Sequence, residues 1–406
     1  MRFTLPKARR ILLTLFIALL AFVAGFTAGK KNFEFADLGS TSQVKLDRTV
    51  SRQGVDFNLF WQVWDKLGAE YFDKTKLDPE RMVYGAIKGM VSAIGDPYTV
   101  FLPPEEQKRT QEDLGGEFEG VGIQIGFKGS QLAVIAPLEG TPAEKAGVKA
   151  GDFIVGIKDK AKEIDKGTFG ITLPDAVDAI RGPAGSQVTL VLTRVGEDEP
   201  FEVELTRAKI TVPSVKLSFV GVGDKIAHLK LLRFGELTNG EWDKAILNIK
   251  DEKAKSVILD LRNNPGGFLD GSLAISSEFL GSGVVVIQED GKGGRQEMRV
   301  TGKPRLPDIK IVVLVNGGSA SASEIVAGAL MDNKRAKVVG EKTFGKGTIQ
   351  ESEDIGSAGL HITTAKWLTP SGTWVNGVGL KPDVEVADDL ETEADEQLQA
   401  AVKLLQ

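Results

Sequence analysis

Residues 309–324 read IKIVVLVNGGSASASE, a continuous apolar segment that passes through a turn of small residues into the expected start of a helix. An uninterrupted apolar run of this kind predicts a strand buried on both faces, as in parallel sheets. Glycine, alanine and serine in the turn allow another segment to approach the backbone closely. From residue 225 to residue 368 apolar strands alternate with helical patterns, which predicts a parallel α/β unit.

The turn after this strand places serines where a helix is expected to begin. Free N–H groups at the amino end of a helix favour negative charge, so a serine in this turn would have oxyanion donors nearby. Residues 321–324 also match the capping box S-x-x-E, which stabilises a helix end without any chemistry. From this segment alone, both a catalytic and a purely structural interpretation stay open.

A second segment, 342–350, contains a lysine between two glycines just before an expected strand. If the strand begins at Lys346, its period of two places Gln350 on the same face, where the amide could orient the amine. The neighbouring residues bring no carboxylate, so burial could lower the lysine pKa from about 10.4 toward the roughly 7 to 8 that a general base needs. The phosphate-loop pattern G-x-x-x-x-G-K-[ST] is absent. An exposed hairpin lysine is the alternative interpretation.

Two glycine-rich loops are further candidates. The motif D-L-R-N-N-P-G-G at 260–267 follows a buried strand and precedes a helix, so its glycines can present backbone N–H groups to a developing negative charge. In the β-rich region that begins at residue 116, the motif G-V-G-I at 120–123 opens a strand. Such a loop beside an exposed strand edge can capture the terminal carboxylate of a peptide and add the peptide as a strand. The structural alternatives are a plain β-to-α turn and an ordinary glycine hairpin.

The composition limits the available chemistry. The chain has 406 residues, 42% of them hydrophobic and 26% charged, which is ordinary for a globular protein of several domains. It has no cysteine and two histidines, which excludes disulfides, thiolate catalysis and cysteine-bound metals. We therefore expect no metal and no cofactor, and a nucleophile that is serine, threonine, lysine or a carboxylate. The net charge of -6 gives no electrostatic reason to expect nucleic acid as a partner.

The amino-terminal part contains a candidate membrane segment. Residues 11–28 are uncharged and almost wholly apolar, and Arg2, Lys7, Arg9 and Arg10 precede them. The run reaches the lower limit of about 17–25 residues for a spanning helix and exceeds the roughly 7–15 apolar residues of a signal peptide. We favour an uncleaved anchor over a cleaved signal, with the basic side in the cytoplasm and the folded part outside it. Beyond a polar linker, helices are predicted from Phe57 and over 79–94, with their aromatic residues forming a core.

Taken together, these segments resemble the bacterial C-terminal processing peptidases, also called tail-specific proteases, which are serine endopeptidases with an inserted PDZ domain. The similarity covers about 57–387, and one departure from it is a lengthened charged stretch at 158–166. The shared motifs are G-D-P-Y-T at 95–99, G-x-G-I at 120–123, T-P-A-x-K-A-G at 141–147, I-R-G-P-x-G at 180–185, D-L-R-N-N-P-G-G at 260–267, N-G-G-S-A-S-A-S-E at 316–324, G-E-K-T-F-G-K-G at 340–347, T-P-S-G at 369–372 and G-x-x-P-D at 379–383. One match would be weak, but this many in the same order is specific.

The resemblance implies a role for each candidate residue. Ser321 would be the nucleophile, Lys346 its general base and Gln350 the residue that positions the lysine. The oxyanion hole would come from the backbone N–H groups of Ala322 and of Gly267 or its neighbouring glycine. The loop that holds the carboxylate of a bound peptide would consist of Gly120, Val121, Gly122 and Ile123.

The implied fold is α/β, with a crotonase/Clp-protease-like peptidase core, an inserted β-rich PDZ domain, an N-terminal helical unit and an N-terminal transmembrane helix. The expected domains are a cytoplasmic tail and anchor (1–31), a linker (32–55), the helical unit (56–115), the PDZ domain (116–208), the Ser/Lys peptidase core (209–387) and a C-terminal helix (388–406). The implied function is cleavage of extracytoplasmic proteins near their C-termini, with the PDZ domain binding or sensing the substrate tail. The expected partners are proteins or peptides with free C-termini and the membrane, while a homo-oligomer or a regulatory adaptor stays open. A catalytically inactive PDZ scaffold and a crotonase-type acyl-CoA enzyme are the alternatives.

Overall fold

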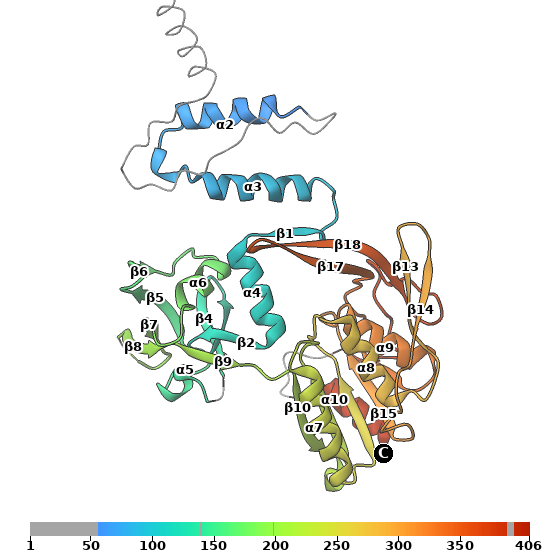
Figure 1. Ribbon diagram of the computed structural model, residues 1–406. Helices are drawn as coiled ribbons and strands as arrows, with labels where there is room; N and C mark the ends of the chain where they lie inside the picture. Colours follow the sequence, from blue (N-terminus) through green and yellow to red (C-terminus); the bar gives the residue numbers. More distant parts are fainter. Residues whose placement is uncertain (1–55, 139, 198, 388–393) are drawn as a thin grey trace, which may run out of the picture. The chain divides into compact units, whose positions relative to one another are not determined.

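The computed structural model describes residues 56–138, 140–197, 199–387 and 394–406. The expected anchor and linker lie outside these ranges, as does part of the expected C-terminal segment. Within them, no helix combines the length and the apolar character needed to cross a membrane. By its internal contacts the chain divides into two units, Met1–Val83 and Tyr84–Gln406, each of which is described by itself. The elements are labelled in Figure 1.

Helix α2 (Asn58–Glu70) forms where the apolar spacing predicted it, and a short 3-10 turn follows at Lys74–Lys76. The expected aromatic core is not formed, because no residue of α2 is buried. The rings of Phe60 and Trp61 meet edge to face at 4.9 Å, and Trp64 lies beside them. A single helix cannot bury its own apolar stripe, and the aromatic residues contact one another and are half-buried.

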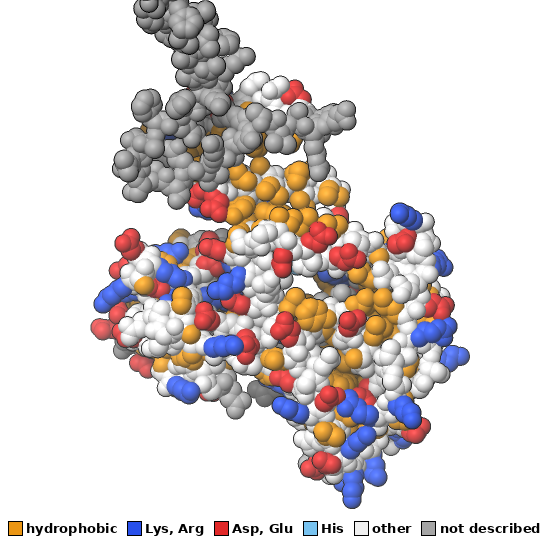
Figure 2. Space-filling view, viewed as in Figure 1, with side chains coloured by type: hydrophobic (Ala, Val, Ile, Leu, Met, Phe, Trp, Pro, Cys, Tyr) orange, Lys and Arg blue, Asp and Glu red, His pale blue; other side chains and the backbone are white. Residues whose placement is uncertain are grey.

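Helix α3 (Pro79–Ser92) also forms close to its predicted limits. Figure 2 shows hydrophobic side chains gathered over this helix. Met90 of α3 is exposed, and so is Ile94, which lies just after the end of the helix. Its one buried residue is Val91, which belongs to a small apolar cluster with Phe101. The amino-terminal helices therefore expose more apolar surface than their spacing suggested.

A six-stranded sheet forms the centre of the second unit, in the order β10-β11-β12-β15-β16-β19. Neighbouring strands are parallel except β10 and β11, which are antiparallel and joined by a 3-10 turn at Val222–Asp224. The strands are β10 (Val215–Val220), β11 (Ile226–Leu231), β12 (Ser256–Asp260), β15 (Lys310–Val315), β16 (Lys337–Gly340) and β19 (Val384–Glu385). As the apolar run predicted, β15 is an inner strand and is buried except for its first residue.

Helices cover both faces of this sheet (Figure 1). Helices α7 (Thr238–Asp251), α8 (Leu269–Phe279) and α9 (Ala322–Asp332) share an apolar core with alternate residues of the strands, such as Val313. Helix α10 (Glu396–Leu405) packs instead against the intervening residues, such as Leu314. Because successive side chains of a strand point to opposite faces, α10 lies on the face opposite to the other three helices.

A second, five-stranded sheet is antiparallel throughout. Its strands are β1 (Val100–Leu102), β13 (Val284–Asp290), β14 (Arg295–Arg299), β17 (Thr348–Ile355) and β18 (Ala358–Leu368). Helix α4 (Pro104–Gly115) follows β1 and contacts β18. The sequence analysis did not predict α4, because its sequence PEEQKRTQEDLG lacks an apolar stripe.

The β-rich module contains a sheet in the order β3-β4-β5-β7-β8, with β6 beside β5 and a separate ribbon of β2 and β9. Its elements are β2 (Glu117–Gly120), β3 (Ile123–Lys128), β4 (Gln131–Pro137), α5 (Pro142–Lys145), β5 (Phe153–Asp159), β6 (Ile164–Gly167), α6 (Leu173–Ile180), β7 (Gln187–Thr193), β8 (Phe201–Thr206) and β9 (Ala208–Thr211). The strand predicted from Gly120 is interrupted at Gly122, which has a φ of 78° and no room for a side chain beside Thr141. The charged stretch at 158–166 forms most of the hairpin of β5 and β6.

Candidate active site

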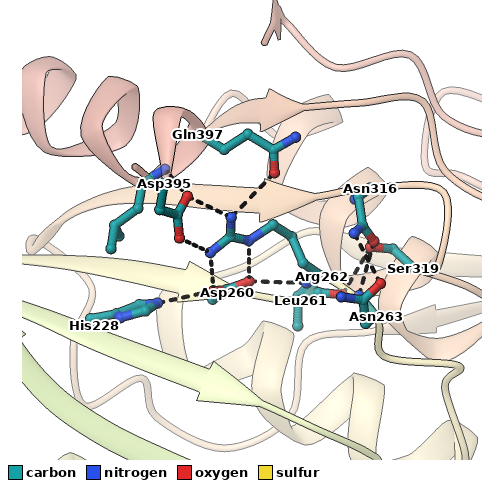
Figure 3. A network of polar contacts seen from close by, with 10 residues as sticks. His228, Asp260, Leu261, Arg262, Asn263, Asn316, Ser319, Asp395 and Gln397 are labelled. Carbon is teal, nitrogen blue, oxygen red and sulfur yellow. Dashed lines mark hydrogen bonds and ion pairs between the residues drawn. The ribbon is translucent and has the colours of Figure 1, made fainter. Parts of the chain in front are cut away.

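Two loops at the carboxyl ends of neighbouring parallel strands carry the serine and the paired glycines. Loop 261–267 follows β12, and loop 316–321 follows β15. Figure 3 shows the side chains of Asn263 and Asn316 together: the Asn263 N–H donates to Asn316 Oδ1 (2.9 Å), and Asn316 Nδ2 donates to Asn263 Oδ1 (3.0 Å). The Ser319 hydroxyl also donates to the carbonyl of Leu261, the first residue of the glycine loop (2.8 Å). These bonds fix the glycine loop against the serine loop.

Ser321 has an unusual backbone conformation just before α9. Its φ is 54° and its ψ is -115°, a region that residues with a Cβ rarely occupy. The Ser321 N–H donates to Glu324 Oε2 (2.9 Å), which is the glutamate half of the expected capping box. Residues that their surroundings hold in strained conformations concentrate at functional sites. The backbone of Ser321 therefore favours the catalytic interpretation of this turn over the purely structural one.

Two backbone N–H groups close to Ser321 have no acceptor in the part of the chain that the structure describes, those of Ala322 and Gly267. The Gly266 N–H is already used, because it donates to Asn264 Oδ1 (2.9 Å). A Cβ on Gly266 would lie 2.9 Å from the Ser321 Cβ, which shows how closely the two loops approach. Of the two glycines, the geometry thus favours Gly267 as an oxyanion donor.

One buried carboxylate connects the serine and lysine segments. Glu324 is fully buried in the first turn of α9 and accepts the backbone N–H groups of Ser321 and Lys346 at Oε2, each at 2.9 Å. At Oε1 it accepts the Gly345 N–H (2.7 Å) and the Thr343 hydroxyl (2.5 Å). The sequence pattern S-x-x-E indicates only a helix cap at Glu324, and no local signal points to its bonds with the lysine segment.

The expected catalytic residues line one cavity of 410 Å³. Its wall contains Ser321, Lys346 and Gln350 together with Gly267 and Ala322. Other residues of the wall come from α4 and from the second sheet: Thr110, Asp113, Leu114, Ser352 and His361. Across the described ranges, no group of three or more His, Asp or Glu side chains could hold a metal ion. The fold therefore gathers residues from distant segments into a single site.

The Lys346 side chain is half-buried. Its amine lies 5.0 Å from the centre of the Tyr98 ring, a distance at which the ring attracts a cation. Burial lowers the pKa of Lys346, and the negative charge of Asp96 partly offsets that effect. Within the described residues, no hydrogen bond joins the amine to the Ser321 hydroxyl, although both line the same cavity.

Gln350 is held by two threonines rather than by the lysine. Strand β17 begins at Thr348, after Lys346, and has an irregularity at Gln350, so the simple alternation that predicted a shared face does not apply. Both residues line the cavity all the same. Gln350 Nε2 donates to Oγ1 of Thr348 (2.8 Å) and of Thr363 (3.0 Å). The amide oxygen has no partner within the described chain.

The glycine loop of the β-rich module borders a second cavity, of 150 Å³. The carbonyls of Val121 and Gly122 accept N–H groups from Ala143 and Leu138, and the N–H groups of these two loop residues have no acceptor among the described residues. The wall contains Phe118, Gly120, Val121, Gly122, Ile123, Ile125, Leu173, Val177, Ile180 and Arg181. The cavity thus combines backbone donors with a largely apolar wall that includes one arginine, as a site for the C-terminus of a peptide requires.

Comparison with known proteins identifies relatives over most of the chain. Residues 225–386 match the profile of Peptidase family S41, residues 134–194 that of a PDZ domain, and residues 20–106 that of the activating protease CtpB N-terminal domain. The carboxy-terminal-processing protease of Bartonella bacilliformis is 40% identical, over 82% of this chain and 75% of that protein. Carboxy-terminal processing protease CtpA of Bacillus subtilis is 34% identical, over 85% of this chain and 72% of that protein.

Among solved structures, the photosystem II D1 C-terminal processing protease is similar over 86% of this chain and 96% of that chain, with a TM-score of 0.51 and 30% identity. The peptidase and PDZ matches fall on the parallel sheet with its helices and on the β-rich module, respectively. The mixed α/β fold with a peptidase domain and a PDZ domain is therefore confirmed.

Proposed function

The chain belongs to the carboxy-terminal processing proteases, serine-type peptidases of family S41, and on this premise we propose that Ser321 is its nucleophile and Lys346 its general base. The observation that carries the proposal is the cavity that both side chains share with the free N–H groups of Ala322 and Gly267. A catalytic histidine is not needed, because a lysine with a lowered pKa can accept the proton of a serine.

The proposed reaction uses each of these groups. The neutral Lys346 amine takes the proton of the Ser321 hydroxyl as its oxygen attacks the carbonyl carbon of the scissile peptide bond. The N–H groups of Ala322 and Gly267 stabilise the negative charge that develops on the carbonyl oxygen. The lysine ammonium then gives its proton to the leaving amine, and an acyl-enzyme forms. Water, deprotonated by the same lysine, hydrolyses that acyl-enzyme and restores the serine.

We propose that rotation of the lysine side chain brings base and nucleophile together. Glu324 binds the backbones of both Ser321 and Lys346, so the two main-chain segments are already fixed to each other. In this proposal the flexible four-carbon side chain of lysine turns from the Tyr98 ring toward the hydroxyl. Gln350 offers its free amide oxygen as a partner for the amine along that path.

The PDZ groove is proposed to bind the C-terminus of the substrate. The free N–H groups of Val121 and Gly122 suit a terminal carboxylate, and Leu173 and Val177 suit an apolar last side chain. The peptide would add to β3 as a further strand. A substrate held by its tail would present a nearby peptide bond to the catalytic cavity, which is consistent with cleavage near the C-terminus.

The folded part is proposed to act outside the cytoplasm, with residues 11–28 as a membrane anchor. The support is the apolar run with basic residues before it. Separating membrane from soluble fractions of cells that express the full chain tests the anchor, and protease digestion of intact cells or spheroplasts tests the side on which the folded part lies. Recovery of the whole chain in the soluble fraction would contradict the anchor.

The catalytic assignment is tested with Ser321→Ala and Lys346→Ala. Both variants should lose all cleavage of an unfolded protein with an apolar C-terminal tail, because each removes a group that takes part in bond breaking. Mass spectrometry of the products, wild type beside variants, identifies the cleaved bonds. Lys342→Ala is the matched control, since this lysine is exposed in the same segment. Cleavage by either catalytic variant at the wild-type rate would reject the dyad, and tail binding without turnover by the wild type would favour an inactive scaffold.

A further inference from the structure

The motif G-D-P-Y-T at 95–99 has no part in the reaction described above, yet it lies beside the catalytic lysine. The Tyr98 ring is the surface over which the Lys346 amine rests. The turn is folded around its own carboxylate: Asp96 Oδ1 accepts the Tyr98 N–H (3.1 Å), and Oδ2 accepts the Thr99 hydroxyl (2.7 Å). The chain then enters β1, which pairs with β18. A carboxylate is therefore held close to the active site by a hydrogen-bonded turn.

Hydrogen bonds connect Asp96 to Gln350 through β18. The Thr99 hydroxyl, which donates to Asp96 Oδ2, also accepts the Thr363 N–H (3.0 Å), so the carboxylate is linked to Thr363 of β18 through Thr99. The side chain of Thr363 then presents a hydroxyl oxygen that can accept a hydrogen bond. Gln350 Nε2 donates to this oxygen at 3.0 Å.

This arrangement determines which way the Gln350 amide faces. Its two N–H hydrogens are directed at Thr348 and Thr363, so the oxygen is the end of the amide that remains for another partner. An amide oxygen can accept a hydrogen bond from the lysine amine, whereas the amide nitrogen cannot. Building on the proposed function, we infer that Asp96 is a positioning residue of the active site, which acts through Thr363 to keep the Gln350 oxygen available to the Lys346 amine.

Asp96 also acts on Lys346 through its charge. Burial lowers the pKa of Lys346 while the Asp96 carboxylate raises it, so the carboxylate favours the protonated amine. Four other titratable groups surround this amine: Tyr98 of the 95–99 turn, Asp113 of α4, Glu324 of α9 and His361 of β18. Because the base works as a neutral amine, loss of the Asp96 charge extends activity to lower pH. Loss of the hydrogen-bond relay instead lowers the rate at every pH, so the two effects can be measured separately.

The test uses Thr363→Val, Asp96→Asn and the double variant, with kcat measured across pH on a tail-bearing protein substrate. Thr363→Val removes the hydroxyl that accepts from Gln350 and keeps the charge, whereas Asp96→Asn removes the charge together with one of the two acceptor oxygens of the turn. We expect kcat at its plateau to fall about tenfold in each single variant, as for loss of one positioning hydrogen bond, and no further in the double variant. The acid limb should move to lower pH by about one unit only where Asp96→Asn is present.

Thr364→Val is the matched control, because the buried hydroxyl of this adjacent threonine has no hydrogen-bond partner in the structure. It should keep the wild-type kcat and pH profile. A wild-type kcat in Thr363→Val, or a loss in the double variant equal to the product of the single losses, would overturn the inference. Failure of the dyad is recognised independently: if Ser321→Ala still cleaves, the dyad and the relay are both rejected. If Ser321→Ala is inactive while Thr363→Val is unaffected, only the relay is rejected.

Discussion

Gly267 occupies a backbone position that no other residue can adopt without displacing its neighbours. Its φ is 137°, and a Cβ there would lie 2.1 Å from the Phe234 carbonyl oxygen. That carbonyl also accepts the Phe268 N–H (2.8 Å), so it cannot move without loosening the same loop. A side chain at this position would therefore push the proposed oxyanion donor away from Ser321.

We expect Gly267→Ala to lower kcat by about 100-fold or more, the range found when one oxyanion donor is lost. Cleavage kinetics on a tail-bearing substrate measure this, and urea unfolding shows how much stability is lost as well. The control is Gly317→Ala in the adjoining serine loop, where the nearest atom to an added Cβ lies 4.0 Å away. Similar losses of kcat in the two variants would contradict the steric argument.

The residues expected to carry chemistry could be found in the sequence, but the contacts that hold them could not. Small residues around the serines of 316–324 and around Lys346 gave a local signal, and the resemblance to the peptidase family selected Ser321 and Lys346 from these segments. The bonds of Glu324 to the lysine segment arise only when α9 and the chain before β17 meet. The link from Asp96 to Gln350 similarly requires β18 to pass between them, and no local pattern encodes that arrangement.

Helix α6, which lines the peptide groove, ends against two cations from other elements. Two carbonyls of its last turn accept hydrogen bonds from Lys162 Nζ (2.6 and 2.5 Å), and two more accept from Arg207 (2.7 and 3.3 Å). Asp159 joins the cations, because it binds the Arg207 guanidinium (2.6 Å) and the Lys162 backbone N–H (3.1 Å). Cations at this end of a helix satisfy its free carbonyls and oppose its dipole. The groove wall is therefore fixed from behind by Lys162 and Arg207.

We expect Lys162→Met to weaken binding of a tail peptide by about threefold to tenfold, since it removes a charged cap from the helix end. Fluorescence anisotropy with a labelled peptide and the full chain measures the affinity. Lys160→Met is the control, because this lysine is exposed in the same turn and has no such contact in the described structure. If both variants bind the peptide equally well, the cap has no influence on the groove.

The limits of several elements could be predicted from the sequence, whereas the function of the charged hairpin could not. Strand β15 and helices α2 and α3 form close to where the sequence predicted them, because a continuous apolar run marks the strand and helical apolar spacing marks the helices. The stretch at 158–166 looked only like a departure from the family pattern. Within this stretch, Lys162 donates to carbonyl groups 16 and 19 residues further along the chain. The role of Lys162 therefore depends on how β5, β6 and α6 pack together.

At the scale of the whole molecule, Arg262 connects the C-terminal helix to the central sheet. Figure 3 shows its guanidinium between two carboxylates, with Nη2 at 2.7 Å from Asp260 Oδ2 and 2.8 Å from Asp395 Oδ2. Asp260 also contacts His228 Nε2 (3.0 Å). Asp395 caps α10 by accepting the Leu398 N–H (2.8 Å). The helix that covers one face of the sheet is thereby attached to the end of β12, from which the glycine loop of the active site begins.

This network makes the stability of the protein depend on pH in a defined direction. Burial raises the pKa of Asp260, but hydrogen bonds from His228 and Arg262 outweigh burial and hold this pKa well below its usual range. Burial likewise raises the pKa of Asp395, and the hydrogen bond from Arg262 lowers it below its usual value. A carboxyl whose pKa is lower in the folded state stabilises that state above its unfolded pKa, and the contribution is lost as the pH falls through the folded pKa. The free energy of unfolding should therefore fall on acidification from about pH 5 to pH 3.

Asp395→Asn should lower the free energy of unfolding by about 1 kcal/mol at neutral pH, a value discounted for the partial exposure of Asp395. The same variant should flatten the dependence of this free energy on acidic pH. Urea unfolding across pH measures both effects, with the exposed Asp251→Asn as the control that changes neither. An Asp395→Asn variant with the acid dependence of the wild type would show that the network does not govern acid stability.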